Sequence, residues 1–300
     1  MSFQSLRRPT RQGSTGQQST HLALAATLAL APLCALAEGN SPWLPIPGQA
    51  SVSLGYTDQT ASDAFIGGKK VAVKDITGGG ASSYDRSSTG LRFDYGFSDA
   101  VAFDGSISYG KTSVGKADND SGATDAVLGL RWRVLDEYEQ PGTPTVTLRA
   151  AAILKGSYDG ARLAALGKDA NGFELSVIVG KQLTPEFSVW GELGTQNRSD
   201  NVPTATFYEL GGRVRVAPQW SLSLGYSNKK FDGNLDIGGA GFSPARFQQV
   251  AEERSVLKFG VGFALAANQG LALSYGKVQD GRNTVNDDRI LGLSYTYAFN

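Results

Sequence analysis

The chain has 300 residues, with 28 basic and 28 acidic residues, 41% hydrophobic residues and 38 glycines. This balanced charge lacks the basic excess of nucleic-acid-binding proteins, so no nucleic-acid partner is expected. A mean hydropathy of −0.20 argues against a bundle of membrane-spanning helices, whereas a membrane β-barrel, in which only alternate residues contact lipid, can be this polar.

Residues 1–37 have the pattern of a cleaved signal peptide. A basic start without acidic residues leads into an apolar stretch over 22–37, and the small-x-small sequence over 35–37 forms a cleavage site before Glu38. A membrane-spanning helix would need about 18 or more apolar residues without a break, but Pro32 interrupts this shorter run. Cleavage would remove the only histidine, the only cysteine and three of the 28 basic residues, which leaves 25 basic against 28 acidic residues.

Residues 38–48 are expected to form a periplasmic lead-in, because three prolines within 41–47 disfavour both helix and sheet. From 49 to 300 the sequence predicts an all-β fold, an antiparallel up-and-down outer-membrane β-barrel of about twelve strands. Large apolar residues alternate there with small or polar ones, which is the period of a strand with two unlike faces. The predicted strands span 49–57, 87–97, 101–112, 124–135, 144–156, 172–184, 187–197, 205–217, 220–229, 254–267, 270–278 and 289–299.

The joints between the predicted strands alternate strictly between short and long. Short joints lie at 98–100, 136–143, 184–186, 218–219 and 268–269, and long joints at 58–86, 113–123, 157–171, 198–204, 230–253 and 279–288. Outer-membrane barrels have short periplasmic turns and longer external loops. We therefore expect an even number of strands, with both termini in the periplasm. Fourteen strands are the alternative to twelve, if 64–77 forms a hairpin of its own.

The two longest loops, 58–86 and 230–253, contain several apolar residues. We expect these loops to extend the strands above the membrane or to fold over the mouth of the barrel. A second interpretation is an apolar vestibule that captures an apolar solute. The apolar residues are Phe65, Ile66, Val71, Val73 and Ile76 in the first loop, and Leu235, Ile237, Phe242 and Phe247 in the second.

Aromatic residues gather near both ends of the predicted strands, as expected for girdles at the two boundaries between lipid and water. They are Tyr56, Tyr109, Tyr226 and Tyr275 at the external end, and Phe97, Phe187, Trp220, Tyr297 and Phe299 at the periplasmic end. Between the girdles, one face of every strand is free of charge. A charge at mid-membrane would cost roughly 2–4 kcal/mol, so this face is assigned to lipid.

The opposite face collects the charged residues at membrane depth and is assigned to the lumen. These candidate lumen or selectivity residues are Arg92, Asp94, Asp104, Arg131, Arg133, Arg149, Lys155, Glu174, Glu192, Glu209, Arg213, Arg215 and Lys258. In one interpretation they line a narrow water-filled path and set its charge selectivity. In the other they pair with each other and brace a largely filled barrel.

An enzymatic function is not expected. Barrel phospholipases, deacylases and proteases generally use a histidine to activate serine or water, and the chain after residue 37 has none. Zinc, haem and copper sites would likewise lack their usual histidine and cysteine ligands, so we expect no cofactor and no metal site.

The order of segments within 124–225 resembles a known family. The segments are Ala126–Asp136, Pro144–Arg149, Gly180–Leu183, Val189–Gly194, Tyr208–Gly212 and Trp220–Gly225, and the lead-in Trp43–Gly48 resembles some members as well. They resemble Gram-negative outer-membrane barrels grouped with proteins of the phenol-degradation meta pathway. The resemblance implies transport of small organic, often aromatic, compounds, and it assigns no binding residues.

We therefore expect a transporter of the cell outer membrane that takes up a small organic solute passively. Its other partners would be outer-membrane lipid, lipopolysaccharide and the barrel-assembly machinery, which would recognise Phe299 near the C-terminus. The alternative is a non-conducting structural or surface-interaction barrel whose external loops bind a partner.

Overall fold

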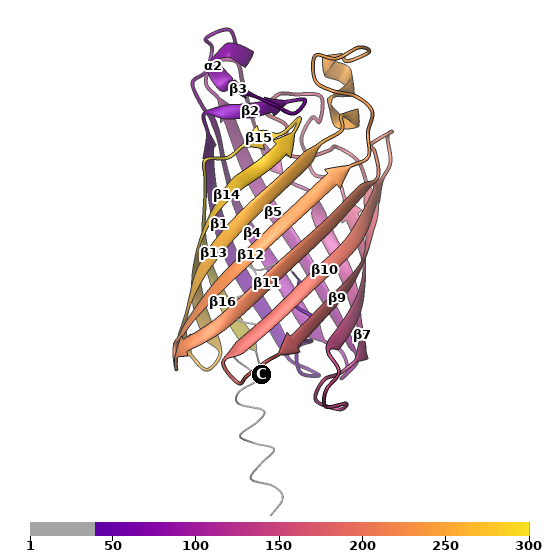
Figure 1. Ribbon diagram of the computed structural model, residues 1–300, viewed down its shortest axis with the longest axis vertical. Helices are drawn as coiled ribbons and strands as arrows, with labels where there is room; N and C mark the ends of the chain where they lie inside the picture. Colours follow the sequence, from indigo (N-terminus) through magenta and orange to yellow (C-terminus); the bar gives the residue numbers. More distant parts are fainter. Residues whose placement is uncertain (1–39, 300) are drawn as a thin grey trace, which may run out of the picture.

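The computed structural model describes residues 40–299, and its strands form a closed antiparallel barrel (Figure 1). The barrel strands are β1 (Ala50–Ala61), β4 (Tyr84–Gly96), β5 (Val101–Val114), β7 (Ala126–Leu135), β8 (Thr145–Leu154), β9 (Gly172–Gln182), β10 (Phe187–Arg198), β11 (Ala205–Ala217), β12 (Trp220–Phe231), β13 (Glu253–Ala266), β14 (Gln269–Arg282) and β16 (Arg289–Phe299). Pairing of β4 with both β1 and β5 closes the ring. The predicted barrel of twelve strands is confirmed for the part of the chain that is described.

The strand register places like residues opposite each other around the barrel wall. Leu54 of β1 lies opposite Tyr295 of β16, and both side chains are exposed on the outer surface. The next pair along, Ser53 and Thr296, is buried on the inner side, where their hydroxyl oxygens are 2.7 Å apart. Because successive side chains of a strand point to opposite faces, this register keeps the apolar phase outside and the polar phase inside.

The long loops are all at one end of the barrel, which we call the long-loop end; the opposite end is the short-turn end. At the long-loop end, β2 (Asp63–Ile66), β3 (Lys69–Ala72) and β15 (Val285–Asn286) form a separate small sheet. The hairpin considered for 64–77 therefore exists, but the fourteen-stranded alternative is wrong because this hairpin pairs with β15 and not with the barrel. Strand β6 (Asp118–Ala123) pairs with the end of β5 and extends the wall upward.

Of the nine apolar residues named in the longest loops, Phe65, Val73 and Leu235 are buried on top of the barrel, and the other six are partly exposed. Phe65 contacts Val256 and Val278, whereas Val73, in the short helix α2 (Val73–Ile76), belongs to a second cluster with Tyr84. The other long loop contains the 3-10 helix η2 (Pro244–Gln249). The packing of Phe65 and Val73 fits loops that fold over the mouth of the barrel, and the apolar vestibule stays a prediction.

Among residues 40–299, no helix is long and apolar enough to cross a bilayer. The signal peptide predicted for 1–37 lies outside the described residues.

Candidate functional site

A network of buried ion pairs lines one side of the lumen, over β4, β5, β7, β8 and β9. Arg131 Nη2 lies 2.5 Å from Asp94 Oδ1. Arg149 lies between two acids, with Nη2 2.8 Å from Asp104 Oδ2 and Nη1 2.6 Å from Glu174 Oε1. The Arg131 and Arg149 side chains are only 2% and 4% exposed. Charges this deeply buried need close partners, so on this side the geometry corresponds to the bracing interpretation.

Asn40 connects this network to the facing side of the lumen. Its Nδ2 donates to Glu192 Oε1 over 3.1 Å, and its Oδ1 accepts from Arg92 Nη2 over 3.3 Å. Arg92 is on β4 and Glu192 on β10, and the shorter arc between these strands contains β5, β7, β8 and β9. One amide therefore bridges two distant parts of the wall, which narrows the lumen at this level.

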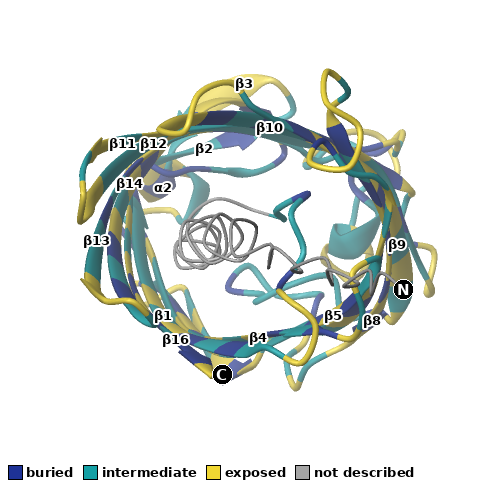
Figure 2. Ribbon diagram, turned by 90° about the horizontal axis from the view of Figure 1, so that it is seen from below, coloured by how far each residue is buried: buried dark blue, intermediate teal, exposed yellow. Residues whose placement is uncertain are grey.

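The segment 40–49, which includes Asn40, lies inside the barrel toward the short-turn end. Thr147 Oγ1 donates to Pro42 O over 2.7 Å, and Trp43 Nε1 donates to Glu137 Oε1 over 2.8 Å. A Cβ at Gly180 would fall 2.5 Å from Pro42 Cγ, so this glycine makes room for the segment. We call residues 40–49 the inner segment; Figure 2 shows the ring of strands that surrounds it, viewed from the short-turn end.

The remaining side of the lumen, over β12, β13, β14, β16 and β1, is lined mainly by small residues. In the inward phase these strands carry Ser221, Ser223, Gly225, Gly260, Gly262, Ala272, Ser274, Gly276, Gly292, Ser294, Thr296, Ser51, Ser53 and Gly55. At Gly292 a Cβ would overlap the Ser274 side chain, so even the wall residues fit closely here. The lumen is thus asymmetric, with large paired ions on one side and short side chains on the other.

Three predicted lumen residues lie away from the network. Arg133 Nη2 donates to Asp99 O over 2.5 Å and Arg215 Nη2 to Pro185 O over 2.9 Å, so both bind carbonyls of short turns. Lys155 follows the last residue of β8, and its half-exposed ammonium lies 3.2 Å from Asp169 Oδ1 in the next loop. Lys155 therefore lies just outside the strand in which the sequence placed it, because β8 ends one residue before it.

Glu209, Arg213 and Lys258 are half-buried on the inner wall of β11 and β13, outside the ion-pair network. The Arg213 guanidinium lies 6.0 Å from the centre of the Trp190 ring. Trp190 is itself buried against Gly211, where any Cβ would overlap the indole.

The sequence reasoning missed the inward-facing aromatic residues Trp190, Phe207 and Phe231. The alternation of strand faces could have predicted that two of them point inward. Phe207 is two residues before Glu209, and Trp190 is two residues before Glu192, so each shares a strand face with an inward acid. They were not expected inside, because aromatic residues of a membrane barrel usually lie at the boundary between lipid and water.

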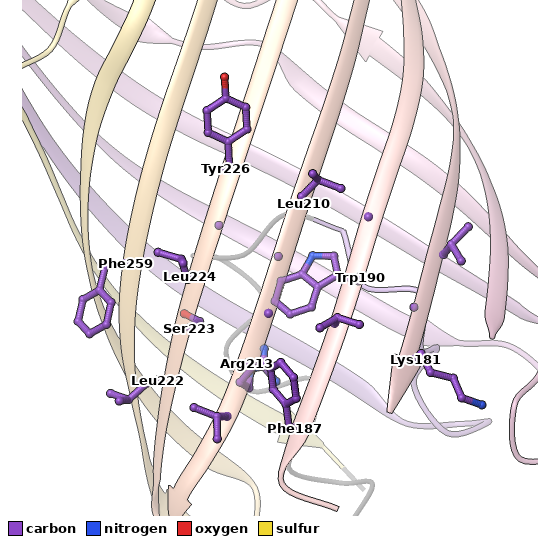
Figure 3. A pocket seen from close by; sticks show the side chains of 18 of the residues that line it. Lys181, Phe187, Trp190, Leu210, Arg213, Leu222, Ser223, Leu224, Tyr226 and Phe259 are labelled. Atoms are coloured by element: carbon purple, nitrogen blue, oxygen red, sulfur yellow. The ribbon is translucent and has the colours of Figure 1, made fainter. Parts of the chain in front are cut away.

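A recess of about 860 Å³ lies at the wall formed by β9 to β13 (Figure 3). Outward residues such as Leu222, Leu224 and Phe259 line it together with the inward Trp190. Glycines at four lining positions, Gly191, Gly211, Gly212 and Gly225, leave the wall thin. The pairing of β10 with β11 and of β11 with β12 is continuous across these positions, so the recess does not break the wall.

A family model described as "Putative MetA-pathway of phenol degradation" matches residues 56–296, which is most of the chain. The chain belongs to this phenol-degradation family. Among solved structures, the COG4313 outer membrane channel from Pseudomonas putida F1 is similar, with a TM-score of 0.68 and 18% identity over 87% of this chain and 99% of that one. At this identity the likeness shows that the two proteins have the same fold.

Two further structures match more weakly. The KdgM porin has a TM-score of 0.47 and 9% identity over 83% of this chain and 99% of that one. The CymD monoaromatic hydrocarbon channel has a TM-score of 0.41 and 10% identity over 85% of this chain and 89% of that one. No curated protein sequence matches this chain.

Proposed function

We propose that this protein is a passive outer-membrane channel for a small organic solute, with its short turns and both termini in the periplasm. Membership of the phenol-degradation family and the fold shared with an outer membrane channel support this function. The observation that carries it is the asymmetry of the lumen. The ion pairs brace one side and leave a path along the small residues of β12, β13, β14, β16 and β1.

The inner segment narrows this path at the level of Asn40. Asn40, Arg92 and Glu192 cross part of the lumen there, so a solute passes between this bridge and the wall of small residues. Charges that line the path are few, which favours a neutral or singly charged organic molecule over a highly charged one.

Substitution of a small residue of this wall by a large one tests whether the solute path runs along it. Ser274→Trp places an indole on the inner face of β14, whereas Leu273→Trp places one on the outer face, where Leu273 is 60% exposed. We expect Ser274→Trp to lower the single-channel conductance in planar bilayers severalfold and to slow the swelling of liposomes in phenol or benzoate. Leu273→Trp should leave both unchanged.

Two results would contradict the proposal. Equal conductance of the two variants would place the path elsewhere. A folded wild-type barrel that carries no current and admits no solute would favour the non-conducting alternative, in which the external loops bind a partner.

A further inference from the structure

A cavity of about 300 Å³ opens into the lumen toward the long-loop end, between β9, β11, β12 and β13. Its lining includes Glu174, Phe207, Glu209, Lys229 and Phe231. This volume is at the lower end of the range for small-molecule sites, so it suits a single-ring compound. Glu174 also belongs to the ion-pair network, which places the cavity directly above the narrow level of the lumen.

Lys229 is a lumen cation without a paired carboxylate. Its Nζ donates to the neutral Gln196 Oε1 over 2.9 Å, and none of the ion pairs within residues 40–299 includes it. Two acids and two cations act on it at longer range, namely Glu174, Glu252, Arg198 and Lys168, so their charges offset one another. An ammonium has three donors, and two of those of Lys229 are available to an anion.

Two of the three acids that line the cavity form ion pairs with cations. Glu174 pairs with Arg149 at 2.6 Å, and Glu252 Oε2 lies 2.6 Å from Lys168 Nζ. Glu209 has Lys258 as its nearby opposite charge. Lys229 is therefore the cation in the cavity whose charge a bound carboxylate would complete.

Two aromatic residues, Phe207 and Phe231, line the cavity together with Lys229. Phe207 of β11 is directly opposite Lys229 of β12 in the strand register. The Phe207 ring rests against β10 at Gly194, where a Cβ would fall 2.7 Å from Cε1, and it lines the cavity. Phe231 is less available, because the Lys168 and Lys229 ammonium groups lie 4.6 and 5.3 Å from its ring centre.

We propose that this cavity is a binding site for a small aromatic carboxylate, which pairs its carboxylate with Lys229 and stacks its ring on Phe207. The site rests on the proposed channel function, since it would hold the solute on the long-loop side of the narrow level. It narrows the solute class from small organic compounds to monoaromatic acids.

Equilibrium dialysis of radiolabelled benzoate against the detergent-purified protein tests the site without requiring a current. We expect saturable binding of one benzoate per chain. Competition by benzamide, which lacks the charge, and by cyclohexanecarboxylate, which lacks the aromatic ring, should be about tenfold weaker than by unlabelled benzoate.

Variants separate the two contacts. Lys229→Met should weaken benzoate binding about tenfold, Lys229→Arg should stay within about threefold of wild type, and Phe207→Leu should remove the preference for benzoate over cyclohexanecarboxylate. Lys277→Met, a change of an exposed lysine on β14, two strands away from β12, is the matched control and should bind as wild type. Retained binding in Lys229→Arg would show that binding depends on the positive charge at this position.

Equal binding of benzoate and benzamide, or wild-type affinity in Lys229→Met, would overturn the site. Planar-bilayer currents distinguish this failure from failure of the channel. If the protein conducts but benzoate does not change the current, the binding site is contradicted and the channel function stands. If the protein binds benzoate but carries no current, the site stands and the channel function is contradicted.

Discussion

Arg149 shows how single residues accommodate charge inside this barrel. It lies on β8 and contacts Asp104 on β5 and Glu174 on β9, so one guanidinium compensates two buried acids. The geometry uses the planar fork of arginine, which can satisfy two carboxylates at once. Lysine could not replace it in this position without losing one of these contacts.

Removal of Arg149 should be costly. We expect Arg149→Met to lower the free energy of unfolding by about 3–5 kcal/mol, because it leaves buried carboxylates without their partner. Urea unfolding of the barrel in lipid vesicles, followed by tryptophan fluorescence, measures this change.

The matched control is Arg289→Met, which removes a pair with Asp58 whose side chains are 48% and 39% exposed. Arg289→Met should lower the free energy of unfolding by about 1 kcal/mol or less. Similar losses for the two variants would contradict a dry, bracing network around Arg149. If the double variant Arg149→Met with Asp104→Asn regains part of the lost free energy of unfolding, that result would support the bracing network.

At the scale of elements, the inner segment lies toward the short-turn end, and the loops joined by Asn283, which we call the long-loop cluster, lie at the long-loop end. The inner segment contacts the inner wall through Asn40, Pro42 and Trp43, and Gly48 N donates to Gly96 O where the segment meets β4. The long-loop cluster depends on Asn283, whose side chain binds Gly67 N, Ile237 N and Ala251 O.

Deletion of 41–47 should widen the lumen. We expect a severalfold increase in single-channel conductance with the barrel still folded, because the β-strand pairing does not depend on this segment. Asn40→Leu, which removes only the bridge between Arg92 and Glu192, should give a smaller increase. A deletion variant with unchanged conductance would show that the segment does not restrict the path.

The loop that contains Asp236 should detach at acidic pH. Hydrogen bonds from Arg282 and Asn283 lower the pKa of Asp236 to about 2. Because the folded-state pKa is below the usual value of 3.8, the contact is fully present above about pH 4 and is lost as the pH falls toward 2.

Pepsin cleavage near Phe242 and Phe247 measures this release, because pepsin cuts beside aromatic residues and works in acid. Cleavage should be slow at pH 4 and rapid near pH 2. In Asp236→Asn the loop should already be open to chymotrypsin at pH 7. Resistance of the variant at pH 7 would mean that other contacts hold the loop.

At the scale of the whole molecule, the barrel separates tryptophans that face lipid from those that face the lumen. Trp132 is 55% exposed on the outer surface, whereas Trp190 is 8% exposed and lies inside. Both are at strand positions within the wall, so depth alone does not distinguish them. Their difference comes only from the face of the strand on which each residue lies.

Brominated lipids test this separation. In a variant that retains Trp132 alone, we expect strong quenching of fluorescence by lipid brominated on the acyl chain. In a variant that retains Trp190 alone, quenching should be weak. Equal quenching of both would contradict the assignment of faces and with it the barrel.

The sequence by itself determined the faces of the strands and the sorting of short and long joints, and it predicted about twelve strands with fourteen as the alternative. Alternation such as that of Leu291 and Leu293 with Gly292 and Ser294 is a local property, because neighbouring residues of a strand necessarily point to opposite sides. For the same reason the charges at Arg131 and Arg149 could be assigned to the interior before their partners were known.

Only the tertiary structure decided which charges meet and what shares the lumen with them. Arg149 reaches Asp104 across β7, and Asn40 joins β4 to β10; both depend on the relative shift of strands around the closed ring and on the entry of the inner segment. Phe207 and Lys229 likewise become neighbours through the register of two strands. These contacts join residues far apart in the chain, so no local pattern encodes them, whereas the faces of each strand follow from its own residues.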